Sequence, residues 1–293
     1  MAIADNDAPA VSNIAAAVKD AALGFGADVV GIAPVERWDA HVPEGYRPAD
    51  LLPGARSVIV VGARGPTAGA WRSPNARVME ILGLDFANDR AVAALTAHIE
   101  DTYEHYAIQA PGLSAAGHQP PFSYMLAATL SGIGKRSLAA NIVLNPQHGL
   151  LYYSACITTL ELPADGMLEQ DVCPHPMCVQ TYKHIGKTPC MAACAADDGG
   201  CLDGSLDEHG RIASSYYDRE RCVSRAMNFG PIALQKALAD MVCEDDADAR
   251  RMFAYSDFFA RACSGVSFYK ESVAQCFECI RVCPVGRQSR KLK

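Results

Sequence analysis

The sequence predicts an α+β fold, because segments with helical and strand patterns follow one another without strict alternation. Two short apolar runs, 28–32 and 57–62, have the length and composition of buried strands. Longer segments carry apolar residues at every third or fourth position, which is typical of amphipathic helices. With 293 residues, half of them apolar, the chain is long enough to form one large domain or two modest ones.

The expected elements can be placed in chain order. Helices are expected at 12–25, 88–106, 123–130, 231–243 and 247–263. Besides the two apolar runs, strands are expected at 141–144 and 150–158. Glycines and prolines predict a loop at 64–75, and 110–121 is expected to be irregular.

Charge and composition argue against several classes of function. The net charge is −7 and neither half of the chain is basic, so no nucleic-acid surface is expected. The first residues are acidic where a signal peptide would be basic, and no apolar run approaches the roughly 18 residues of a membrane span. We therefore expect a cytoplasmic protein. The basic tail is expected to be a solvated end; it contains Arg287, Arg290, Lys291 and Lys293.

The cysteines are concentrated in one region, since all twelve lie at or after Cys156. The last three form the run Cys276-Phe-Glu-Cys279-Ile-Arg-Val-Cys283-Pro284. This spacing is typical of bacterial ferredoxins, in which the final cysteine of such a run binds a second cluster. The run therefore predicts two 4Fe-4S clusters and requires further thiolates upstream.

The upstream cysteines supply the missing ligands. We expect one cluster to be bound by Cys173, Cys178, Cys190 and Cys283. We expect the other to be bound by Cys194, Cys222, Cys276 and Cys279. Cys201 remains an alternative ligand that would replace one of these. The other three, Cys156, Cys243 and Cys263, have apolar surroundings and are expected to be inert core thiols.

Zinc and disulfides are the competing interpretations of these cysteines. Zinc sites pair two short Cys-x2-Cys motifs, which leaves the three-cysteine run before Pro284 unexplained. Disulfide scaffolds have a higher cysteine density, about 8–10 per cent of a short chain. His175, between two prolines, is expected to be a loop residue and not a ligand.

A glycine-rich turn, Gly132-Ile-Gly134-Lys135, is a second candidate site. It does not match a phosphate loop, because Thr129 stands at the first glycine position and Arg136 replaces the serine or threonine. A packed turn and a contact with the tail of a cofactor are both compatible with it. Candidate proton donors flank the turn, namely His118, Tyr124 and His148.

Several segments resemble, in the same order, the epoxyqueuosine reductase and reductive dehalogenase superfamily. The matching segments are 27–33, 53–60, 126–134, Asn145-Pro146 with Gly149, Arg221-Cys222-Val, and the Cys276 run. The resemblance covers about residues 14 to 288 and is most specific at the cysteines.

The resemblance implies two domains. Residues 1–165 would form a nitroreductase-like core that binds cobalamin on a mixed sheet flanked by helices, and 166–293 a ferredoxin-like module with two 4Fe-4S clusters. An electron donor such as ferredoxin or flavodoxin would reduce the clusters, which would reduce cobalamin and then a small organic substrate. The expected cobalamin-binding residues are Gly132, Gly134, Lys135, Asn141 and Ser224. The expected proton donor is His118 or Tyr124.

The chain departs from the epoxyqueuosine reductase pattern at three places. His118 stands where an aspartate is expected, Lys135 stands where a tryptophan is expected, and eleven residues separate Cys178 from Cys190. The chain also lacks a helical-repeat extension for tRNA after the last cysteine. These departures argue against epoxyqueuosine as the substrate. One alternative is an activator that reduces the cobalt of a separate corrinoid methyltransferase, and another is a corrinoid-free two-cluster ferredoxin.

Overall fold

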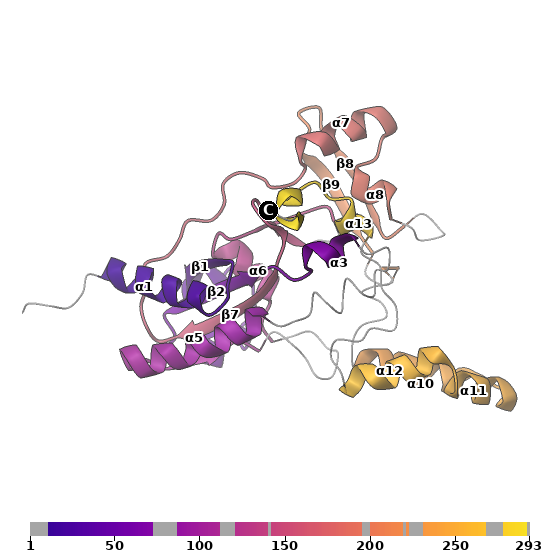
Figure 1. The fold of residues 1–293 in the computed structure, drawn as a ribbon, viewed down its shortest axis with the longest axis horizontal. Helices are drawn as coiled ribbons and strands as arrows, with labels where there is room; N and C mark the ends of the chain where they lie inside the picture. Colours follow the sequence, from indigo (N-terminus) through magenta and orange to yellow (C-terminus); the bar gives the residue numbers. More distant parts are fainter. Residues whose placement is uncertain are drawn as a thin grey trace, which may run out of the picture.

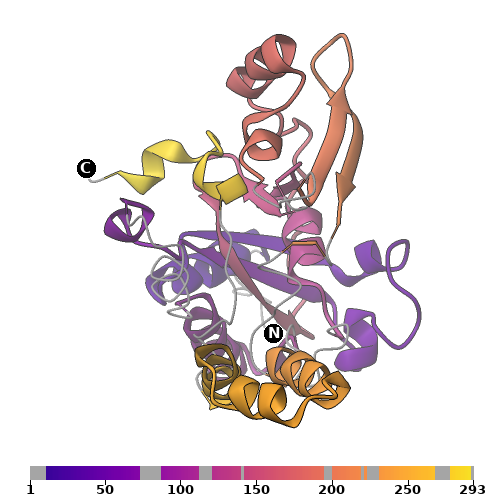
Figure 2. The same ribbon diagram turned by 90° about the vertical axis from the view of Figure 1, so that its right-hand side faces the viewer.

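The computed structural model describes most of the chain and mixes helices with strands, as predicted (Figures 1 and 2). The described residues are 11–72, 87–111, 121–139, 142–194, 200–218, 221–222, 231–267 and 278–291. The helices are α1 Val11–Gly24, η1 Val35–Trp38, α2 Pro48–Leu51, α3 Ala68–Arg72, α5 Ala87–Tyr103, α6 Tyr124–Leu130, α7 Pro176–Ile185, α8 Pro189–Ala192, α10 Pro231–Cys243, α11 Ala247–Ala254, α12 Asp257–Ser267, α13 Glu278–Arg281 and η2 Arg287–Arg290. The strands are β1 Val29–Pro34, β2 Ser57–Ala63, β3 Ala107–Gln109, β4 Lys135–Arg136, β5 Val143–Asn145, β6 Gly149–Leu150, β7 Tyr152–Thr158, β8 Leu202–Leu206 and β9 Ile212–Tyr217.

The main sheet has four strands in the order β1-β2-β7-β3, and each neighbouring pair is antiparallel. The expectation of a mixed sheet is therefore wrong for the described strands. The connection from β1 to β2 runs through η1 and α2 and brings the chain back beside β1. Strand β2 therefore runs antiparallel to β1, and no crossover connection is needed.

Helices cover both faces of this sheet, which explains why its central strands read as unbroken apolar runs. Side chains alternate between the faces along β2. Val58 and Val60 pack towards Trp38 and α6, whereas Ile59 and Val61 pack towards α1 and α5. Every residue of β2 is buried as a result.

A second, smaller sheet joins the main sheet to the cysteine region. Its strand order is β4-β5-β6, and α6 leads into it through the Gly132 turn. The amide of Asn145 donates to the carbonyl of Ile133 at 2.8 Å, and its Oδ1 accepts from the amides of Gln147 and His148 at 2.9 Å each. One buried side chain therefore fixes the turn between β5 and β6.

The last helices before the final cysteines form a separate group. α10, α11 and α12 lie at the opposite end of the molecule from α7 and the β8–β9 hairpin (Figures 1 and 2). The single helix predicted at 247–263 is wrong, because α11 ends at Ala254 and α12 begins at Asp257. Ser256 caps the second helix by accepting a hydrogen bond from the amide of Phe259 at 3.2 Å.

The other long elements agree with the sequence prediction to within a few residues. The prediction missed β3, α7 and the β8–β9 hairpin, and the loop predicted at 64–75 is wrong at α3. Within the described ranges, none of the helices combines the length and apolar character that crossing a lipid bilayer requires.

Candidate metal centre

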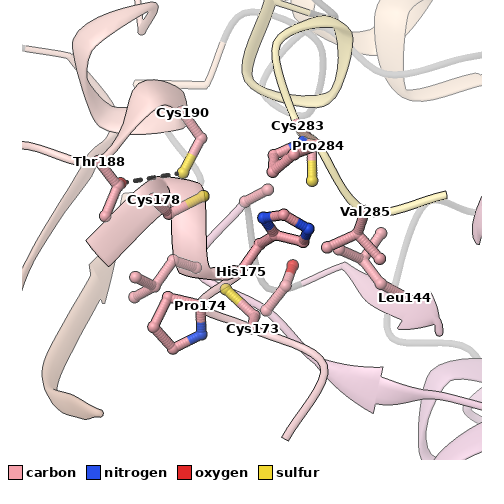
Figure 3. Close-up of a pocket in the computed structure, with 13 residues that line it drawn as sticks. Leu144, Cys173, Pro174, His175, Cys178, Thr188, Cys190, Cys283, Pro284 and Val285 are labelled. Atoms are coloured by element: carbon pink, nitrogen blue, oxygen red, sulfur yellow. Dashed lines mark hydrogen bonds between the residues drawn. The ribbon is translucent and has the colours of Figure 1, made fainter. Parts of the chain in front are cut away.

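Four of the cysteines predicted to share a cluster line one cavity, and we call them the first thiol group (Figure 3). They are Cys173, Cys178, Cys190 and Cys283. They come from the segment before α7, the first turns of α7 and α8, and the residues that follow α13. The empty volume of the cavity is about 330 Å³, including the part open to solvent. The structure therefore brings together thiols separated by more than a hundred residues of sequence.

The starts of two short helices place two of these thiols. Pro176 opens α7 and Pro189 opens α8, at positions where a missing amide hydrogen has no cost. His175, predicted to be a loop residue, caps α7, since its Nδ1 accepts from the amide of Met177 at 3.2 Å. Cys178 and Cys190 therefore lie in first turns whose direction is fixed by proline.

A backbone contact between two glycines places Cys283. Gly149 and Gly286 both have positive φ, +71° and +68°. A Cβ on Gly286 would lie 2.1 Å from the amide nitrogen of Gly149, and one on Gly149 would lie 2.4 Å from the carbonyl oxygen of Val285. Only glycine allows this approach. The turn after β5 thus holds the C-terminal segment against the cavity.

Arg290 stabilises the same segment. Its guanidinium donates to the carbonyl oxygens of Ile280 at 3.1 Å, Cys283 at 3.3 Å and Val285 at 3.2 Å. It also stacks on the ring of Trp71 in α3, 4.2 Å from the centroid. The expectation that Arg290 belongs to a solvated tail is wrong, because its guanidinium is hydrogen-bonded to main-chain carbonyls, including that of the predicted ligand Cys283.

The side chain of Thr188 also reaches the first thiol group. It is 1% exposed, and its hydroxyl lies 3.2 Å from the sulfur of Cys190. Hydrogen bonds to the sulfurs of an iron–sulfur cluster are one of the factors that set its reduction potential. The sequence analysis missed this residue because a threonine before a proline has no distinctive spacing.

Burial makes the first thiol group unfavourable for negative charge. Together with a smaller effect of neighbouring thiolates, it raises the pKa of Cys173 to about 12 and that of Cys178 to about 11. Burial also raises the pKa of Cys190 and Cys283. At neutral pH these thiols keep their protons. A bound metal cation would replace those protons and compensate the charge of the thiolates.

A second thiol group lies beside the first. It contains Cys194, Cys201 and Cys222, and Cys279 packs against the same hydrophobic cluster. The sulfurs of Cys194 and Cys201 are 3.2 Å apart, and Cys201 also interacts with Cys222. Cys201 was predicted only as an alternative ligand, whereas the structure puts it inside this group. Cys276, the predicted fourth ligand here, lies outside the described residues.

Two pairs of cysteines connect the groups. Cys190 and Cys194 are four positions apart and belong to different groups. Cys279 packs against the hydrophobic cluster around Ile280 that cysteines of both groups share, and it is four positions from Cys283 of the first group. In a two-cluster ferredoxin each run donates its last cysteine to the other cluster, which is the assignment predicted for Cys283 from the sequence.

No three His, Cys, Asp or Glu side chains in the described ranges converge on one point as the ligands of one metal ion would. Metal binding by these cysteines stays a prediction.

The residues expected to bind cobalamin contact other parts of the protein. A Cβ on Gly132 would lie 2.1 Å from the carbonyl oxygen of Gly166, and one on Gly134 would lie 2.9 Å from the hydroxyl of Tyr153. Lys135 donates to the carbonyl of Glu169 at 3.0 Å and pairs with Asp171 at 2.8 Å. The turn is therefore packed against the segment that leads to Cys173.

The expected proton donors are only partly visible. Tyr124 donates its hydroxyl proton to the carbonyl of Ala110 at 2.7 Å. His148 lies beside Arg290 and Trp71 in a small pocket, and its buried Nδ1 has no hydrogen-bond partner among the residues that the structure describes. His118 and two of the expected cobalamin contacts, Asn141 and Ser224, lie outside the described residues. Their roles stay predictions.

Solved structures with a similar fold were found, whereas no protein-family model and no curated protein matches the sequence. Epoxyqueuosine reductase from Bacillus subtilis aligns with a TM-score of 0.52 at 15% identity, over 94% of this chain and 66% of that one. An epoxyqueuosine reductase bound to a tRNA-Tyr stem loop gives 0.54 at 14% identity, over 97% and 68%. A reductive dehalogenase described as B12-dependent gives 0.52 at 16% identity, over 89% and 36%.

The chain thus spans about two thirds of the epoxyqueuosine reductases and about a third of the dehalogenase. At these identities the likeness concerns the fold alone. The resemblance predicted from the sequence is confirmed at that level: over nearly its whole length, this chain has the fold of epoxyqueuosine reductases and reductive dehalogenases.

The raised thiol pKa values predict how pH affects the cluster-free protein. In the unfolded chain a thiol loses its proton near pH 8.5, whereas folded Cys178 and Cys173 keep theirs to about 11 and 12. Between these limits the folded state binds more protons, so stability must fall as pH rises. The thermal midpoint should decrease from pH 8.5 to 11. Cys178→Ala should flatten this decrease, whereas Cys243→Ala, at an exposed position, should not. A midpoint that rises over this range would contradict the assignment.

Proposed function

We propose that this protein is a corrinoid-dependent reductase in which two 4Fe-4S clusters carry electrons to cobalamin. The observation that supports it most is the pair of adjacent thiol groups linked through Cys190/Cys194 and Cys279/Cys283. When bound, the clusters would supply one-electron transfer at potentials set by their surroundings. The fold likeness supports an oxidoreductase, because both classes of similar structures are reductases by name.

The protein residues would have distinct tasks at these clusters. The first thiol group would bind one cluster, and Cys194, Cys222, Cys276 and Cys279 the other. Leu138, Leu144 and Val285 form apolar walls that limit water at the first cluster. Thr188 and Arg290 would stabilise negative charge on its sulfur ligands.

The cobalamin part of the proposal rests on the fold and not on the observed turn. Described residues of the expected site are already in contact with protein groups, Gly132 with Gly166 and Lys135 with Asp171. We therefore derive no reaction step at a cobalt atom. These occupied contacts favour the alternative function, an electron-transfer protein that reduces the corrinoid of a separate methyltransferase.

Iron content tests the cluster assignment. Anaerobic reconstitution with iron and sulfide should give about eight irons per chain, since two cubanes form. Cys178→Ser should leave about four irons, because only the first thiol group loses a ligand. Cys243→Ser is the matched control, as this exposed cysteine belongs to neither group, and should keep about eight. A single zinc without sulfide in the wild type would refute the assignment.

The reduction potential tests the effect of Arg290. Its positive charge, close to the main chain of Cys283, favours the more negative reduced state of the first cluster. Arg290→Gln should move this potential to a more negative value in a redox titration followed by EPR, whereas Arg290→Lys should move it less. Arg287→Gln removes an equal charge from an exposed position three residues away and should have little effect. Equal shifts in the two glutamine variants would contradict a specific effect of Arg290.

Cobalamin binding separates the reductase from the ferredoxin alternative. Cobalamin added to the reconstituted protein should change its visible spectrum in a saturable manner. Lys135→Met should weaken binding about tenfold if a charge-assisted hydrogen bond is lost. The exposed pair with Asp171 contributes little stability, so Lys135 can leave it at small cost. Arg136→Met, the neighbouring exposed cation, should bind normally. An unchanged spectrum would leave the two-cluster electron carrier as the function.

A further inference from the structure

Cys201 has no assigned part in a two-cluster protein, because eight other cysteines already supply the ligands. It is nevertheless buried, 7% exposed, and lies in the second thiol group. Its sulfur is 3.2 Å from that of Cys194, and its amide donates to the same sulfur at 3.0 Å. Cys243 and Cys263 are exposed instead, so the expectation that they are core thiols is wrong, whereas Cys156 is buried as expected. Cys201 is thus placed against a predicted cluster ligand.

The fold builds this contact from two features. Gly200 has φ +84°, and a Cβ there would lie 3.1 Å from the sulfur of Cys194, so the chain can turn back on Cys194 only with glycine at this position. The β8–β9 hairpin then holds Cys201 from the other side. Its pairing extends past Tyr217, since the amide of Asp218 donates to the carbonyl of Cys201 at 2.9 Å. Cys201 therefore has little freedom to move away.

The two thiols differ in their access to solvent. Cys194 is partly exposed, whereas Cys201 is buried. A small oxidant would therefore react first at Cys194. Cys201 would be the second thiol, already in van der Waals contact, and the sulfurs need to approach by only about 1 Å to reach bonding distance.

We propose that Cys194 and Cys201 form a reversible disulfide when the second cluster is lost under oxidation. Hydrogen peroxide oxidises the Cys194 thiol to a sulfenic acid and leaves as water. The Cys201 sulfur then attacks, the S–S bond forms, and a second water leaves with the remaining proton. In total two thiols lose two electrons and two protons to one peroxide. The disulfide protects Cys194 from irreversible oxidation and blocks cluster insertion until a dithiol reduces it.

Peptide mapping tests the disulfide directly, and it does not depend on metal binding. The full-length cluster-free protein is treated with one equivalent of peroxide, alkylated and cleaved at aspartate. Asp197 and Asp198 separate the two cysteines, so the disulfide joins two peptides that mass spectrometry can identify. A Cys194–Cys201 cross-link is expected. Recovery of Cys201 joined to Cys222, or of both thiols unlinked, would overturn the proposal.

Cluster loading tests the consequence, and this part rests on the proposed function. After peroxide, wild type should reload about four irons, and about eight once dithiothreitol has been added. Cys201→Ser should load about eight before excess peroxide. After excess peroxide it should load about four even with dithiothreitol, because a second peroxide converts the unprotected Cys194 sulfenic acid to a sulfinic acid, which dithiothreitol does not reduce. Cys243→Ser should behave as wild type. Full recovery of Cys201→Ser would overturn the protective role, whereas failure of untreated wild type to load iron would instead refute the clusters.

Discussion

The four-residue spacing within two cysteine pairs constrains the second half of this chain. Cys190 and Cys194 are about one helical turn apart, as are Cys279 and Cys283. In the proposed assignment one thiol of each pair would bind each cluster. Two clusters bound in this way could not move apart without unfolding α8 or α13. The remaining contacts in this region have one shared effect, which is to bring the other thiols to these two short helices.

Contacts of other residues have to bring these segments together, because the thiols do not attract one another. Buried thiolates repel one another, and as neutral thiols they form only weak hydrogen bonds. The segment that carries Cys283 is instead held by Gly149 against Gly286 and by three hydrogen bonds from Arg290. Backbone contacts therefore set the position of the main chain at the site, and apolar side chains form its wall. A cation can enter it without first having to order the chain.

The spacing of the cysteines in the sequence predicted which thiols form the first thiol group. It did not predict the residues that hold these thiols in place. The run from Cys276 to Pro284 has the spacing of a ferredoxin run, which predicted Cys283 as a ligand of a different cluster from Cys279. Arg290 was predicted to belong to a solvated basic tail, because the sequence around an arginine does not show whether its guanidinium is buried. The hairpin that positions Cys201 was missed because β9 is largely exposed and polar, with no apolar alternation to mark a strand. The break between α11 and α12 depends on a single serine cap within a continuous helical pattern.

The glycine turn and the first thiol group are mechanically connected, which links the two halves predicted from the sequence. Lys135 pairs with Asp171, only two residues before Cys173, and it also binds the carbonyl of Glu169. On its other side β4 leads directly to Ser137 and Leu138 in the cavity wall. A fold of this kind serves more than one substrate, so its identity does not define what binds at the turn. A ligand that drew Lys135 away from Asp171 and Glu169 would remove two contacts to the segment that leads to Cys173. Since the ion pair is exposed, this loss would cost little, and the packing of Gly132 against Gly166 would still join the turn to that segment.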